Sequence, residues 1–217
     1  MAPLAPPRGL SALREARRRA ILEATRALAT EHGADGFTVE QVAERAGVSR
    51  RTIFNYVAGL DQLLVEVCEQ ILDDATTALL AEIFRRWGDD DAAAGTAAPA
   101  LLDAVAQATR SIDLPSAIAS IDRALGSPDS DDERLQVISR TAFDHAGGRL
   151  REQLLHRAPD LDPVDLEIGL ALLFAGIAVI AEIWLDRHRD PTSEVSPTAR
   201  ADWAQLLDRV LVRVRTG

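Results

Sequence analysis

The pattern of apolar and polar positions predicts helices along nearly the whole chain. Apolar residues recur at the spacing of an amphipathic helix, as at Ile21, Ala24 and Leu28, and no segment shows the sustained alternation of a strand. Hairpin-turn signals are missing apart from Asp35-Gly36, which falls in a loop. We therefore expect an all-α fold of about nine helices.

Two short helices between residues 38 and 56 have clear start and stop signals. Thr38 is a good N-cap, and Gln41 three positions later completes a capping box. This helix ends at Gly47, because glycine takes a left-handed backbone conformation without steric cost. Ser49 caps a second helix that runs to about Tyr56. Two short helices joined by such a glycine-containing turn form a helix-turn-helix.

Composition divides the chain into three parts. Residues 1–10 are rich in proline and predict a disordered arm, 11–60 a helix-turn-helix domain, and 61–217 a larger helical domain for ligand binding and dimerisation. Residues 1–60 carry nine arginines and six carboxylates, a net charge of +3, whereas 61–217 carry fifteen arginines and twenty-eight carboxylates, a net charge of −13. A basic end on an acidic body permits contact with DNA but does not establish it.

Proline-containing caps mark the last two helices of the body. Asp-Pro at 162–163 and Ser-Pro at 196–197 place an N-cap before a proline in the first turn. A preceding helix reaches about Arg157 and contains two adjacent glycines at 147–148, so we expect it to be disrupted there.

The chain has the composition of a protein from a reducing, aqueous compartment. Cys68 is the single cysteine, which excludes an intramolecular disulfide, and the N-terminus has no apolar stretch typical of a signal peptide. The charge-free stretch 168–181 is shorter than the roughly 20 residues that a membrane span needs. We therefore expect a cytoplasmic protein with no membrane segment, in which this stretch is a buried helix.

The second short helix carries side chains that suit DNA. Arg50 and Arg51 lie at its N-terminal end, which usually enters the major groove, and arginine bonds bidentately to guanine or phosphate. A segment from 49 to 56 is about 12 Å long, which matches the groove width. The candidate DNA-binding residues are Thr38, Gln41, Ser49, Arg50, Arg51, Thr52, Asn55 and Tyr56. The alternative is a helical corner whose outer face is merely solvated.

The segment "ILEATRALATEHGADGFTVEQVAERAGVSRRTIFNYVAGLDQLL" resembles the N-terminal domain of the tetracycline-repressor (TetR) family of bacterial transcription regulators. The resemblance covers residues 11–64 and fades beyond about residue 70. It implies an all-helical homodimer, a two-fold DNA operator and repression relieved by a small molecule. By position, Thr38 and Tyr56 would bind phosphates, and Arg50, Arg51, Thr52 and Asn55 would face the groove.

Two positions depart from the family pattern. Phe54 stands where the family often has tyrosine, and Leu60 stands where a phosphate-binding lysine is common. Both changes weaken the expected backbone contacts. We hypothesise that arginines on the N-terminal arm and the first helix compensate, namely Arg8, Arg14, Arg17, Arg18 and Arg19.

The resemblance also implies that the last two helices pair with their two-fold mates. Small residues in the first of them would permit close approach: Gly169, Ala171, Ala175, Gly176 and Ala178. The alternative is that both helices are simply the core of a monomer.

A pocket for an unknown, largely apolar effector is implied by the family. The candidate wall residues are the bulky side chains Phe84, Trp87, Phe143, Phe174 and Trp184, although side chains of this kind are more often plain core than pocket wall. Glu182 and His145 are the polar residues that we expect near this pocket. The effector would favour a conformation whose recognition helices no longer match the operator.

Enzymatic function has little support in the sequence. Helical di-iron sites need Glu-x-x-His pairs, which do not occur, and neither a catalytic triad nor a phosphate-binding glycine loop can be assembled. We expect no catalytic residue, metal site or cofactor. A helix-turn-helix used only for protein contacts is a further alternative.

Overall fold

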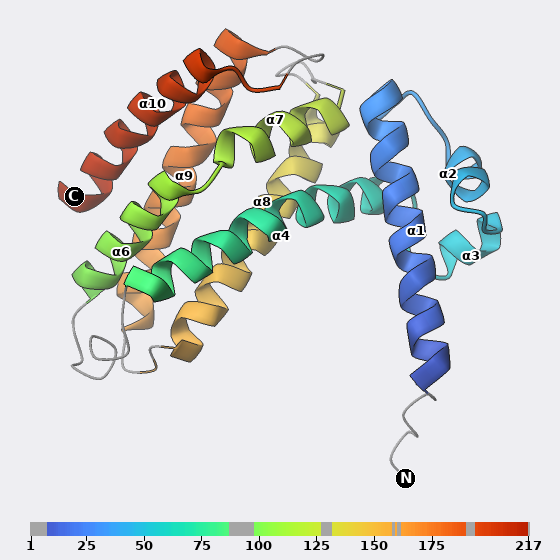
Figure 1. The fold of residues 1–217 in the computed structure, drawn as a ribbon, viewed down its shortest axis with the longest axis horizontal. Coiled ribbons are helices and arrows are strands. Elements are labelled where there is room, and N and C mark those ends of the chain that lie inside the picture. The colour runs from blue at the N-terminus through green and yellow to red at the C-terminus, as the bar shows by residue number, and fades with distance from the viewer. Residues whose placement is uncertain are drawn as a thin grey trace. The chain divides into compact units, whose positions relative to one another are not determined.

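The structure is a computed structural model that describes residues 8–86, 98–126, 132–157, 159, 162–189 and 194–216. These residues form nine helices and no strand, which confirms the all-α prediction (Figure 1). The helices are α1 (Arg8–His32), α2 (Val39–Arg45), α3 (Arg50–Phe54), α4 (Leu60–Arg86), α6 (Ala98–Ser111), α7 (Leu114–Ala124), α8 (Glu133–Arg157), α9 (Pro163–His188) and α10 (Pro197–Thr216).

The helices form two compact units. The first comprises Met1–Cys68 and Asp122–Ser139, and the second comprises Glu69–Ile121 and Arg140–Gly217. Helices α4, α7 and α8 each contribute residues to both units.

The core of the first unit joins α1 to the helix pair α2 and α3. Ile21 and Leu22 on α1, Val42 on α2 and Ile53 on α3 are almost fully buried. Burying such side chains stabilises the unit by about 1.5–3 kcal/mol each. The helix pair is therefore fixed by its apolar inner face, which leaves its polar outer face in solvent.

The first turn of α8 is joined by ion pairs to the segments on either side of the helix-turn-helix. Arg134 forms ion pairs with Asp35, in the loop after α1, and with Asp61, at the start of α4. Gly33 and Gly126 both have positive φ, and a Cβ on Gly33 would lie only 3.1 Å from the Gly126 Cα. A side chain at either glycine would separate the ends of α1 and α7.

The core of the second unit lies among α4, α6, α7, α8, α9 and α10. Helices α9 and α10 run side by side (Figure 1), and the fully buried Trp184 of α9 donates from Nε1 to the Ala199 carbonyl at 2.7 Å. The expected disruption of α8 is wrong, because the helix continues through Gly147 and Gly148. A Cβ on Gly147 would be 3.4 Å from the Phe174 ring, which is ordinary van der Waals contact, so this part of α8 packs against α9.

Helix α9 is longer than its charge-free stretch suggested. It spans 26 residues with a mean hydropathy of 2.3 in its most apolar window, so length and composition alone would let it cross a membrane. A single helix of this kind is weak evidence, because core helices pass the same test. Leu170, Leu173 and Ile177 on one face are buried in the second unit. The other face is exposed in the isolated chain.

Candidate functional site

The turn between α2 and α3 aims α3 outward from the first unit. Gly47 has a φ of 65°, and the Val48 N–H donates to the Ala43 carbonyl at 2.9 Å, which closes the turn. Ser49 then caps α3 by accepting from the Thr52 N–H at 3.1 Å. The predicted helix-turn-helix and the N-cap at Ser49 are both present.

The capping box that starts α2 is also present. The Thr38 N–H donates to Gln41 Oε1 at 2.8 Å, and the Gln41 N–H donates to the Thr38 hydroxyl at 3.4 Å. Both side chains are exposed beside the free N–H groups of the first turn. A helix N-terminus of this kind favours an anion such as phosphate.

The two arginines at the start of α3 are on the surface. Arg50 is 63% exposed, bonds the Glu40 carboxylate at 2.8 Å and lies 5.3 Å from the centre of the Phe54 ring. Arg51 is exposed as well. Neither cation is folded into the core, so both are available to a ligand outside the unit.

The remaining candidate residues lie on the same outer face or at its edge. Asn55 is exposed at the C-cap of α3, and the Thr52 hydroxyl is hydrogen-bonded to Ser49 at 2.8 Å. The Tyr56 hydroxyl donates to the Arg14 carbonyl at 3.3 Å, and the Arg14 guanidinium lies 5.6 Å from its ring. Tyr56 thus ties the end of the helix pair to α1.

Family comparison identifies this domain. Residues 21–67 match the model of the bacterial regulatory proteins of the tetR family. The N-terminal domain is that of a TetR-family regulator. Family membership rests on this N-terminal match, and TetR proteins regulate transcription, which points away from an enzyme.

One solved structure supports the fold, and a second has a lower TM-score. A proposed transcriptional regulator from Pseudomonas aeruginosa PAO1 has a TM-score of 0.52 and 20% identity over 94% of this chain and 92% of its own. SmeT, the repressor of the Stenotrophomonas maltophilia multidrug efflux pump SmeDEF, has a TM-score of 0.47 and 20% identity over 90% of this chain and 89% of its own. At these identities the first likeness shows the fold alone. No curated protein matches the sequence.

The second unit exposes an apolar stripe on α9. We define the α9 stripe as Val164, Ile168, Leu172, Val179 and Ile183, which are 37–62% exposed. Their spacing of four or seven residues places them on one helix face. Exposed alanines at 171, 175 and 178 border them. Such a contiguous apolar surface marks an interaction site more often than isolated apolar residues do.

The candidate pocket residues are not gathered at one place. Phe143 and Phe174 line an inner apolar cavity of about 40 Å³, together with Leu79, Leu150 and Ile177 among others. Phe84 is half-buried under the Arg157 guanidinium, and Trp184 is core. Trp87 lies outside the described residues.

The two polar residues expected near a pocket lie elsewhere. Glu182 is exposed on α9, and His145 pairs with Glu69. Within the described part of the chain, no group of three or more His, Cys, Asp or Glu residues could hold a metal.

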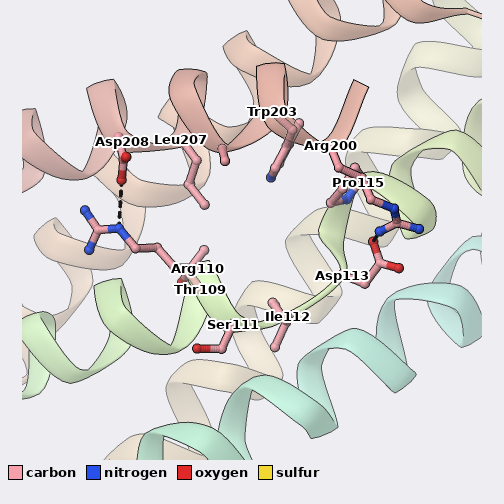
Figure 2. Close-up of a pocket in the computed structure, with 11 residues that line it drawn as sticks. Thr109, Arg110, Ser111, Ile112, Asp113, Pro115, Arg200, Trp203, Leu207 and Asp208 are labelled. Atoms are coloured by element: carbon pink, nitrogen blue, oxygen red, sulfur yellow. Dashed lines mark hydrogen bonds and ion pairs between the residues drawn. The ribbon is translucent and has the colours of Figure 1, made fainter. Parts of the chain in front are cut away.

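A larger cavity of about 380 Å³ lies where the α6–α7 junction faces α10 (Figure 2). Ion pairs between Arg110 and Asp208 and between Arg200 and Asp113 flank it. Sequence reasoning missed this site, because its two walls are more than eighty residues apart and neither carries a motif.

Proposed function

We propose that this TetR-family regulator is a cytoplasmic bacterial repressor that binds a palindromic operator as a homodimer and is released by a small, largely apolar ligand. The observation that carries the DNA-binding part is the exposure of Arg50 and Arg51 at the N-terminal end of α3, beyond the Gly47 turn.

In this proposal α3 enters the major groove. Arg50 and Arg51 form hydrogen bonds with bases or phosphates. Thr52 and Asn55 contact base edges, and Ser49 is the N-cap of the helix. Glu40 competes for Arg50, but an exposed ion pair contributes only about 0–1 kcal/mol. A phosphate or guanine contact can therefore replace it.

A second set of contacts fixes the helix on the DNA backbone. Thr38 and Gln41 hold the N-terminus of α2, where free N–H groups suit a phosphate, and Tyr56 supplies a contact at the far end. The arginines at 14, 17, 18 and 19 are exposed on α1 and add positive charge. Arg18 is paired with Glu66 at 2.7 Å.

The α9 stripe supports the homodimer. One recognition helix reads few base pairs, whereas two copies held about 34 Å apart read two half-sites on one face of DNA. A two-fold interface built from the α9 stripe of each protomer would bury side chains that a monomer leaves half-exposed. This arrangement accounts for the apolar face of α9 without a membrane.

The inner cavity between Phe143 and Phe174 supports an apolar effector site that forms on binding. Its volume of about 40 Å³ is far below the roughly 300–1,000 Å³ of ligand pockets. The ligand would therefore have to displace aromatic side chains. That displacement gives the ligand a preference for a second conformation, which regulation requires.

Fluorescence anisotropy with a labelled duplex from upstream of the coding sequence tests the DNA-binding proposal. We expect wild type to bind specifically, with an affinity that falls steeply with salt. Arg50→Ala/Arg51→Ala removes four arginines from a homodimer, so it should weaken binding at least a hundredfold and flatten the salt slope by up to about four.

The matched control is Arg140→Ala/Arg209→Ala, which removes two exposed arginines outside the helix-turn-helix. It should bind DNA as wild type does. If both double variants lose affinity equally, the effect is one of overall charge and the assignment of α3 is wrong. A folded wild type that binds no upstream duplex would favour a helix-turn-helix used for protein contacts.

A further inference from the structure

The 380 Å³ cavity between the α6–α7 junction and α10 has the size of a small-molecule site. Its apolar walls come from Ile112 and Pro115 on one side and from Leu207 on the other (Figure 2), and Ala204 of α10 also lines it. These side chains can hold the apolar body of a ligand.

Trp203 supplies a polar group at this cavity that has no partner within the described residues. Its side chain is only 4% exposed and packs edge-on against Trp184, with ring centroids 5.7 Å apart. The Trp184 N–H donates to Ala199, whereas the Trp203 indole N–H makes no hydrogen bond in the part of the chain that the structure describes. Figure 2 shows the Trp203 ring nitrogen directed into the cavity. Buried N–H groups are nearly always paired, so this donor favours a ligand with an acceptor atom.

The charges around the cavity are balanced. Arg110 Nε bonds Asp208 Oδ1 at 2.7 Å at one end, and Arg200 pairs with Asp113 at the other (Figure 2). Arg200 also donates to the Ser116 hydroxyl at 3.0 Å. Because each cation already has a carboxylate, neither an anionic nor a cationic ligand gains a net attraction. The cavity thus suits an uncharged ligand.

We propose that this cavity binds a small uncharged organic molecule whose ketone or amide oxygen accepts a hydrogen bond from Trp203 Nε1–H. The apolar body of the ligand lies between Pro115 and Leu207. The inner cavity shares Thr109 and Ile112 with this site but is not lined by Trp203. The proposal does not depend on DNA binding, and its test measures ligand binding directly.

The test uses the naphthyl ketone prodan, whose emission responds to hydrogen bonding at its carbonyl. Titration of the full chain should saturate, and acetophenone should displace the dye. α-Methylstyrene has the same shape with a methylene group in place of the oxygen, and it should compete about tenfold more weakly. Equal competition by the two would contradict a role for the indole N–H.

Two variants locate the bound dye. Trp203→Phe keeps an aromatic ring but removes the donor, and it should bind prodan about tenfold more weakly and no longer distinguish acetophenone from α-methylstyrene. Ala204→Phe fills the cavity from an exposed helix position and should abolish binding. Ala201→Phe, on the same helix but away from the cavity, is the matched control and should bind as wild type does.

Two results would overturn the proposal. The first is a wild type that does not bind prodan up to the solubility limit of the dye. The second is an Ala204→Phe variant that binds prodan as wild type does, which would place the dye in the inner cavity or on the surface.

Discussion

Val179 offers a quantitative test of the α9 stripe as a dimer interface. Its side chain is 56% exposed in the isolated chain. Val179→Ala removes two carbon atoms, worth about 0.8 kcal/mol each when fully buried. Scaled by the exposed fraction, the substitution costs the interface about 0.9 kcal/mol per copy and about 1.8 kcal/mol per two-fold dimer. The dissociation constant of the dimer should therefore rise about twentyfold.

The control and the assay make this prediction specific. Val137 on α8 has the same residue type and the same 56% exposure but lies off the stripe. Val137→Ala should leave the dimer unchanged in sedimentation equilibrium, whereas Val179→Ala should shift it. Alanine has the higher helix propensity, so neither variant should lower helicity. The reasoning is refuted if the two variants dissociate alike, or if wild type is a monomer at micromolar concentration.

Three further substitutions test separate parts of the account. Gly47→Ala should lower the free energy of unfolding by about 1 kcal/mol in urea titration. The cost comes from the backbone alone, because φ at this position is 65° and no atom lies within 4 Å of the added Cβ. An unchanged free energy of unfolding would show that the turn readily adopts another conformation. Glu40→Gln should tighten DNA binding a few-fold at low salt by freeing Arg50, and weaker binding would contradict this view of the pair. The hydrogen bond from Arg85 lowers the pKa of Glu82 from 4.5 to about 2, so this carboxylate stabilises the fold above pH 4.5 and loses that effect as pH falls towards 2. The difference in melting temperature between wild type and Glu82→Gln should shrink over that window, and a constant difference would argue against the linkage.

The helix-turn-helix could be predicted because its signals are local. The capping box of Thr38 and Gln41, the glycine at 47 and the cap at Ser49 each act within four residues. Local hydrogen bonds and backbone sterics therefore determine the conformation with little help from the rest of the chain.

Features that depend on distant packing could not be predicted in the same way. Gly147 resembles a helix breaker, but α8 continues through it and packs against the Phe174 ring of the next helix. Helix α9 is apolar on nearly every side, so its pattern does not reveal which face is left exposed. The Trp203 cavity depends on α6 and α10 meeting across about ninety residues of chain.

Hydroxyl-radical footprinting of the upstream DNA tests the central claim most directly. Two α3 helices presented by one homodimer should protect two half-sites on one face of the duplex, spaced by one helical turn or a multiple of it. Arg50→Ala/Arg51→Ala should erase both protections together. A single protected half-site, or a pattern that survives in the double variant, would contradict the account.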